Sequence, residues 1–199
     1  MEILRIVTSF GDLVVLLPLA AALAFWLARQ GTPRLTAYWI LSVLFCIAVT
    51  AVLKIYFVAC GSVHSAMHSP SGHTSLSVLV YGALATIVAT EQTGIRRQGV
   101  VALAVLFVLA IAGSRLALHA HSLEEVLLGG LVGGLSLAAF LRAYLRHHLP
   151  QLKLGQILMV MVVLPVALTG HSPNVETFVR SVGHYLHESG MACFGSPDQ

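Results

Sequence analysis

Two short segments of this 199-residue sequence hold the side chains best suited to acid–base and nucleophilic chemistry. The segment from Cys60 to His73 is rich in hydroxyl and imidazole groups and contains no carboxylate. The segment from His119 to Glu125 combines two histidines with two adjacent carboxylates. Together they hold five of the ten histidines. This combination favours an anionic substrate, with one histidine as nucleophile, another as general acid, and a carboxylate that orients the nucleophile.

The stretch from Ser71 to Thr74 has the pattern of a helix start. Ser71 is a suitable N-cap, and Gly72 lets a ligand approach the backbone closely. The first N–H groups of a helix bind anions such as phosphate. Lys54 and Arg115 both lie within apolar stretches, where a charge costs at least about 2.5–3.5 kcal/mol. A bound phosphate would explain why both cations are tolerated there.

These residues form motifs that resemble those of the type 2 phosphatidic acid phosphatase family, which shares its fold with vanadium haloperoxidases. The sequence from Pro70 to His73 reproduces the family motif Pro-Ser-Gly-His. Ser114-Arg115, followed by five residues, His121, three residues and Glu125, matches a second motif that ends in aspartate. The resemblance covers residues about 54 to 134.

The resemblance implies a role for each matching residue. His121 would be the nucleophile that becomes a phosphohistidine, Glu125 its orienting carboxylate, and His73 the general acid. In this family fixed cations and N–H groups stabilise the transition state, so no metal or other cofactor is expected. The matching phosphate-binding residues are Lys54, Ser71, Gly72 and Arg115.

The chain departs from the family pattern at two positions. Gly61 stands where a motif that begins at Lys54 has arginine, so one phosphate ligand is missing. The remaining candidates for that charge are Arg5 and Arg180, of which Arg180 is the better placed. Glu125 replaces aspartate, which keeps the charge and lengthens the side chain by one methylene.

Structural roles compete with several of these assignments. Ser122 and Glu125 also form a capping box that could simply start a helix, and Glu124 could then orient His121 instead. Lys54 could extend to the membrane interface. Four histidines, which lack a regular ligand spacing, offer a metal site as a further alternative: His64, His68, His119 and His121.

Six apolar stretches are long enough to cross the roughly 30 Å hydrocarbon core of a bilayer. The chain is 57% hydrophobic and 10% charged, whereas soluble domains have about 25% charged residues. The net charge of +3 does not indicate nucleic-acid binding, because the arginines form no basic face. We predict an all-α, polytopic membrane protein with transmembrane helices near residues 13–28, 37–59, 74–90, 99–118, 124–144 and 155–169.

The basic residues predict an orientation in the membrane. Seven of the eleven lie in the first, third and fifth connections between these stretches, and the second and fourth connections contain none. By the positive-inside rule, both termini and the candidate site are extracytoplasmic. In a bacterial inner membrane the site would face the periplasm.

The predicted organisation is a membrane domain of residues 1–170 and an extracytoplasmic tail of residues 171–199 with a candidate interfacial helix. Cys60 and Cys193 both fall on the outer side, where they could form a disulfide bond. Two overlapping Gly-xxx-Gly spacings are typical of close helix packing in lipid, and they comprise Gly129, Gly130, Gly133 and Gly134.

The resemblance implies a metal-independent lipid phosphatase that hydrolyses a phosphate monoester or diphosphate. Its partners would be the membrane and a phospholipid or polyprenyl (di)phosphate substrate. Two alternatives remain open at this point. One is a lipid phosphotransferase of the same family, and the other is a degenerate site, lacking the arginine, that serves binding or transport.

Overall fold

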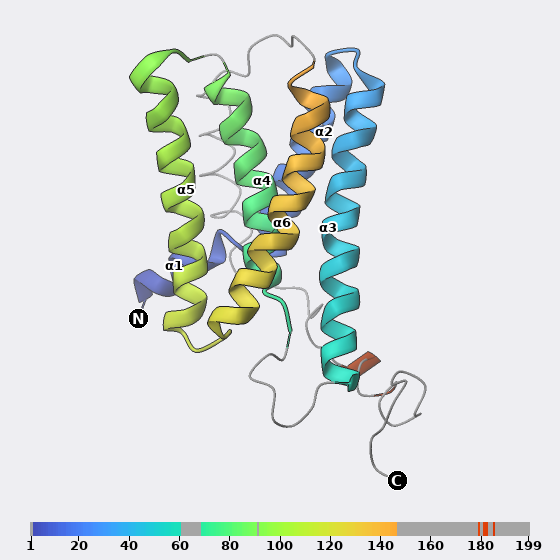
Figure 1. Cartoon of the computed structure of the whole chain (residues 1–199), viewed down its shortest axis with the longest axis vertical. Helices are drawn as coiled ribbons and strands as arrows, with labels where there is room; N and C mark the ends of the chain where they lie inside the picture. The colour runs from blue at the N-terminus through green and yellow to red at the C-terminus, as the bar shows by residue number, and fades with distance from the viewer. Residues whose placement is uncertain are drawn as a thin grey trace.

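The computed structural model describes residues 2–60, 69–90 and 92–146, together with residues 179, 181, 182 and 185. This described part is helical and contains no strand. Figure 1 shows the helices running up and down in one bundle, apart from the short α1, which lies across it. The helices are α1 (Glu2–Ser9), α2 (Leu13–Arg29), α3 (Pro33–Cys60), α4 (Gly72–Ala89), α5 (Gly94–Ala117) and α6 (Leu123–Tyr144).

Five helical stretches of the described part are long and apolar enough to cross a membrane. They correspond to the first five predicted spans, and the all-α prediction is confirmed for the described residues. The sixth predicted span, residues 155–169, and the domain boundary at residue 170 lie outside the described residues. One helix, α1, was not predicted from the sequence. It precedes the first span and is separated from α2 by a turn at residues 10–12.

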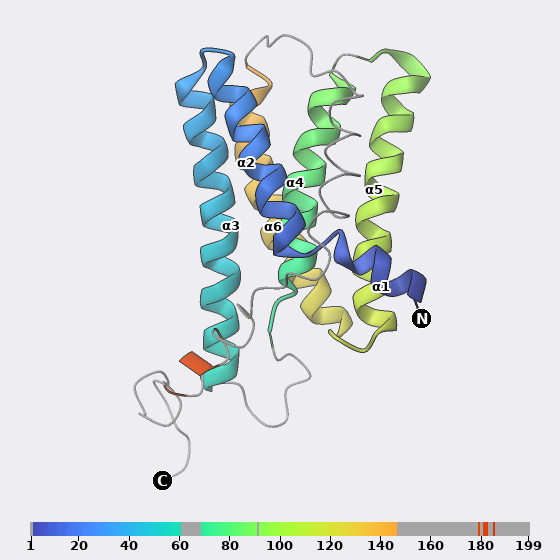
Figure 2. The same cartoon turned by 180° about the vertical axis from the view of Figure 1, so that it is seen from behind.

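The central helix of the bundle is α4. Two thirds of the residues of α4 are buried. In α5, by contrast, only 17% of the most apolar 18-residue stretch is buried, and large aliphatic side chains are exposed. Figures 1 and 2 show α4 between α5 on one side and α2, α3 and α6 on the other. Because α4 begins at the predicted anion-binding turn, its burial fixes that turn within the bundle.

Two glycines let α6 approach the backbone of α4. A Cβ at Gly129 would lie 2.5 Å from the Ser71 carbonyl oxygen, and one at Gly133 would collide with the Ser75 carbonyl oxygen. A Cβ at Gly130, by contrast, would meet nothing within 4 Å. Of the two predicted Gly-xxx-Gly spacings, the one beginning at Gly129 therefore faces α4.

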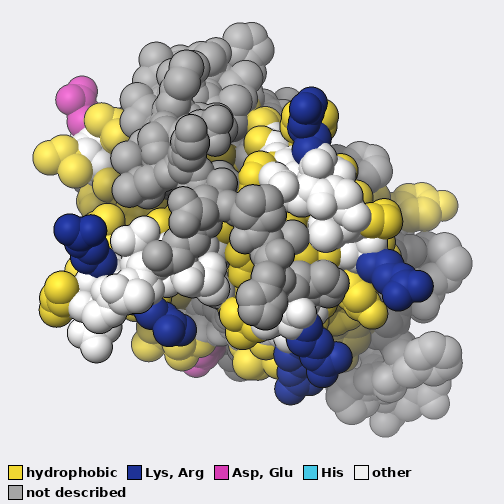
Figure 3. Space-filling model, turned by 90° about the horizontal axis from the view of Figure 1, so that it is seen from above, with side chains coloured by type: hydrophobic (Ala, Val, Ile, Leu, Met, Phe, Trp, Pro, Cys, Tyr) yellow, Lys and Arg dark blue, Asp and Glu magenta, His cyan; other side chains and the backbone are white. Residues whose placement is uncertain are grey.

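Arginines gather at the end of the bundle where α2, α4 and α6 finish and where α3 and α5 begin (Figure 1). Figure 3 views this end and shows Lys and Arg side chains spaced around it. The described parts of both histidine segments, residues 69–73 and 119–125, lie at the opposite end. The described arginines at the helix termini of this end are Arg29, Arg34, Arg96, Arg97, Arg142 and Arg146.

The two described cysteines of α3 differ in chemical state. Cys60, the last residue of the helix, is disulfide-bonded. Cys46 is a free and fully buried thiol. Cys193, the partner considered for Cys60 from the sequence, lies outside the described residues.

Candidate active site

The most buried histidine–carboxylate pair of the described residues joins the end of α5 to the start of α6. His121 Nδ1 lies 2.6 Å from Glu125 Oε2, and the two side chains are only 8% and 6% exposed. An imidazole that donates from Nδ1 to a carboxylate keeps a lone pair on Nε2. The pair therefore fixes the ring and leaves the Nε2 lone pair available for nucleophilic attack.

A Schellman-type turn explains how five residues connect Arg115 to His121. The N–H groups of His119 and Ala120 donate to the carbonyls of Leu116 and Arg115, both at 3.0 Å. His119 occupies the left-handed position of this turn with φ of 52°. The turn folds the chain back, so that the His121 N–H approaches the Arg115 carbonyl at 3.4 Å.

Glu125 combines the two roles that the sequence left as alternatives. Its Oε2 accepts the Ser122 N–H at 3.2 Å and completes a capping box at the start of α6, while the same oxygen contacts His121. Its Oε1 accepts the Ser69 N–H at 2.7 Å. Glu124, by contrast, is exposed. In a capping box the third residue of the helix is Glu or Gln, and Glu125 holds that position in α6. The capping role accounts for glutamate where the family motif has aspartate.

The start of α4 is bonded directly to Glu125. The Ser71 N–H donates to the Glu125 carbonyl at 3.0 Å, and the Ser71 hydroxyl caps α4 by accepting the Thr74 N–H at 3.4 Å. The first N–H groups of a helix have no acceptor in the helix itself, and in α4 these belong to Gly72 and His73. They make the start of α4, beside the histidine pair, the candidate anion-binding position.

Lys54 and Arg115 both act electrostatically on His121. Burial is the largest effect on the pKa of His121 and lowers it from 6.5. Glu125 raises that pKa, and the charges of Arg115 and Lys54 lower it. Lys54 is itself buried, 7% exposed, and so does not extend along the lipid-facing surface. The lowered pKa keeps His121 neutral at neutral pH, as a nucleophile requires.

His73 has a partner that the sequence did not reveal. Its Nε2 lies 2.6 Å from Asp12 Oδ1 in the turn between α1 and α2. From the same segment, Thr8 accepts a hydrogen bond of 3.2 Å from Arg115 Nη1. The one available signal was composition, because Asp12 is one of only two aspartates in the sequence.

All seven predicted site residues thus belong to the described part and lie at one end of the bundle. Several related positions lie outside it: Gly61, Arg180, His64 and His68. Arg5 is described, and it is an exposed residue of α1, three positions before Thr8.

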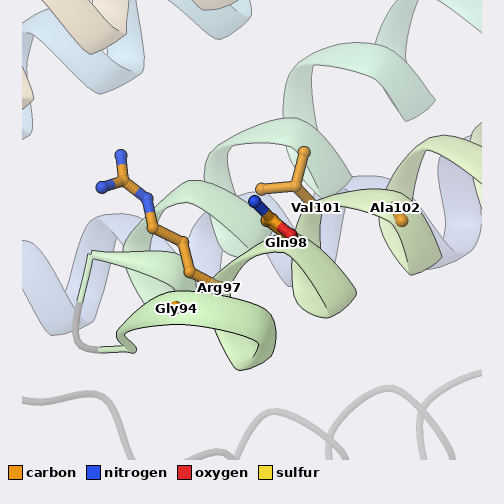
Figure 4. Close-up of a pocket in the computed structure, with 5 residues that line it drawn as sticks. All are labelled: Gly94, Arg97, Gln98, Val101 and Ala102. Atoms are coloured by element: carbon orange, nitrogen blue, oxygen red, sulfur yellow. The ribbon is translucent and has the colours of Figure 1, made fainter.

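A separate pocket of about 550 Å³ lies at the other end of α5. Figure 4 shows the five residues that line it, all from α5. Arg97 in this pocket and Arg115 are 18 residues apart on one helix, or about 27 Å at 1.5 Å per residue. The pocket is therefore remote from both histidine pairs. Its lining residues are Gly94, Arg97, Gln98, Val101 and Ala102.

Comparison with known proteins identifies a family and one relative for this chain. The PAP2 superfamily model matches residues 54–149, a stretch that contains all seven predicted site residues and excludes Thr8 and Asp12. A Klebsiella pneumoniae protein named "Uncharacterized 22.5 kDa protein in cps region" is 36% identical over 143 residues, which cover 69% of this chain and 67% of the relative. No solved structure matches the chain.

Proposed function

The chain belongs to the PAP2 superfamily, whose members are generally phosphatases, and on that premise we propose that it hydrolyses a lipid phosphate ester or diphosphate through a phosphohistidine. The observation that carries the proposal is the buried His121–Glu125 pair, with two cations acting on it beside a helix N-terminus. The apolar helices support a substrate that reaches the site from the membrane.

In the first step His121 Nε2 attacks phosphorus and forms an N–P bond. The P–O bond to the leaving group breaks, its electron pair goes to oxygen, and His73 supplies the proton that the oxygen takes up. Glu125 holds Nδ1–H and stabilises the positive charge that develops on the ring of His121.

The negative charge on the phosphoryl oxygens is met by groups fixed before the reaction starts. Lys54 and Arg115 supply positive charge, and the N–H groups at the start of α4 supply hydrogen bonds. Such preorganised donors stabilise a pentacoordinate transition state without having to reorient. The same set of groups serves both steps of the reaction.

In the second step water replaces the leaving group. His73, now neutral, takes a proton from the water as its oxygen attacks phosphorus. The N–P bond breaks, inorganic phosphate leaves, and the lone pair returns to His121 Nε2. A lipid hydroxyl in place of water would make the protein a phosphotransferase, so the acceptor distinguishes the two activities.

The proposal is tested with purified protein in detergent micelles or vesicles. The substrates are phosphatidic acid, phosphatidylglycerophosphate, undecaprenyl diphosphate and lipid A. We expect release of inorganic phosphate from at least one of them, and a trapped phosphoenzyme that is labile to acid and stable to alkali. Failure to release phosphate from every lipid of the panel, with no phosphoenzyme formed, would refute the proposed activity.

We also propose that the site faces the extracytoplasmic side, because the described arginines of the helix connections gather at the other end of the bundle. The test labels intact cells with an impermeant thiol reagent. Ala120→Cys, near the site, should react, whereas Gln98→Cys, at the arginine-rich end, should not; both positions are exposed. Labelling of Gln98→Cys alone would reverse the orientation.

A further inference from the structure

The turn at residues 10–12 brings a carboxylate from outside the matched family region onto His73. Asp12 Oδ1 lies 2.6 Å from His73 Nε2, although the two residues are 61 positions apart. The family model matches residues 54–149, so the match includes His73 and does not extend to Asp12. The family match therefore does not assign a role to Asp12.

Three contacts hold this turn against α4 and α5 independently of Asp12. The Tyr81 hydroxyl of α4 donates to the Phe10 carbonyl at 2.7 Å, and the Phe10 ring packs edge-on against Phe107 of α5. Gly11 is so close to the neighbouring side chains that an added Cβ would lie 2.8 Å from Ile111. The backbone position of Asp12 is therefore set by the packing of its neighbours, and this position brings the carboxylate within reach of His73.

The Asp12 side chain does not cap the helix that it precedes. It is the N-cap of α2, where an aspartate side chain normally accepts an N–H bond from the first turn. Here the backbone carbonyl of Asp12 accepts from Val15 and Leu16, but the side chain makes no capping bond. The carboxylate is directed to His73 instead.

We propose that Asp12 is a positioning residue for His73 in the proton transfer to the leaving group, an inference that rests on the proposed phosphatase function. Asp12 accepts the Nε2–H of His73 and fixes the ring, which leaves Nδ1 as the nitrogen that serves the leaving oxygen. Nδ1 gives its proton to that oxygen as the P–O bond breaks, and later receives one from the attacking water. Asp12 touches neither substrate nor phosphorus.

This role predicts a dependence on the leaving group that a purely structural contact would not produce. An alkoxide leaves slowly unless it is protonated, whereas p-nitrophenolate leaves without a proton. Asp12→Ala should therefore lower phosphate release from phosphatidic acid about ten- to a hundredfold, which is at most the lower end of the roughly 10²–10⁴-fold range for general-acid catalysis, because His73 itself remains. The burst of p-nitrophenolate from p-nitrophenyl phosphate, which reports the first step alone, should change less than about threefold.

The matched control is Glu2→Ala, which removes a negative charge from the same segment at an exposed residue of α1. It should behave as the wild type with both substrates. Equal losses with both substrates in Asp12→Ala, or no loss with either, would overturn the positioning role. A wild-type protein that releases phosphate neither from any lipid of the panel nor from p-nitrophenyl phosphate, and that forms no phosphoenzyme, would instead overturn the proposed function, and the positioning role with it.

Discussion

The two histidine–carboxylate pairs have the same length, 2.6 Å, and very different settings. His121 and Glu125 are four residues apart, 8% and 6% exposed, and joined through the first turn of one helix. His73 and Asp12 are 61 residues apart, 24% and 40% exposed, and joined only by the packing of the N-terminal turn. The proposed nucleophile is thus held in a buried and local arrangement, whereas the proposed proton donor is partly exposed.

The roles proposed for the two histidines are consistent with this difference. A nucleophile must be neutral and fixed, and burial with two nearby cations lowers the pKa of His121 accordingly. A group that exchanges protons with a departing alcohol and an entering water needs access to both.

The largest expected effect comes from removing the two imidazoles in turn. His121→Ala should lower phosphate release by more than about 10⁴-fold and abolish the phosphoenzyme, because no nucleophile remains. His73→Ala should lower it by about 10²–10⁴-fold while the nucleophile can still be phosphorylated by p-nitrophenyl phosphate. Acid-labile phosphoenzyme, measured in both variants, distinguishes them. A phosphoenzyme that survives in His121→Ala would assign the nucleophile to another group.

The second test compares the two carboxylates by stability. Glu125→Ala removes the acceptor of the Ser69 and Ser122 N–H groups, each loss costing about 1–3 kcal/mol where the group is buried. Asp12→Ala should cost under about 1 kcal/mol, since the pair it breaks is partly exposed. Thermal unfolding in detergent measures both. Equal destabilisation by the two variants would contradict the contrast.

The third test moves the anion-binding turn relative to the nucleophile. Gly129→Ala places a Cβ 2.5 Å from the Ser71 carbonyl oxygen, so α4 and α6 must separate, at a cost of about 1–3 kcal/mol. Phosphate release should fall with it. Gly130→Ala, one residue later and facing open space, is the control and should leave turnover unchanged. Loss of turnover in both variants would show that the fifth span tolerates no alanine for reasons other than this contact.

The fourth test uses pH. Because the pKa of His121 is lowered from 6.5, the wild type should keep its turnover below pH 6.5 and lose it only as His121 becomes protonated. Lys54→Met removes a charge that lowers this pKa, so the acidic limb of the pH–rate profile should move to higher pH. An unchanged or lower acidic limb would mean that Lys54 does not act on the nucleophile.

The smallest expected effect concerns a histidine outside both pairs. His119 is exposed and holds a left-handed backbone conformation, φ of 52°, that glycine adopts without steric cost. His119→Gly should raise the free energy of unfolding by up to about 1 kcal/mol and leave turnover unchanged. A loss of activity would give His119 a chemical role that its exposure does not indicate.

The local parts of the site were accessible from the sequence, and the remote parts were not. The anion-binding turn and the His121–Glu125 spacing depend on a few neighbouring residues, so helix-capping rules and motif spacing predict them. Asp12 and Thr8 reach the site only because an unpredicted helix, α1, packs across the end of α5. The length of an apolar stretch predicts a transmembrane helix, but it does not predict where a turn before that helix packs.

The bonds from Ser69 and Ser71 to Glu125 set the distance between the start of α4 and the start of α6 directly. Between these residues the chain crosses the bundle twice, through α4 and α5, over about 27 Å and 36 Å at 1.5 Å per residue. A slight bend in either helix would be magnified over that path if the chain alone set the distance. Because the bonds join the two helix starts directly, their distance does not depend on the exact course of α4 and α5. The connection between α4 and α5 can therefore change in length without altering the spacing between the start of α4 and the His121–Glu125 pair.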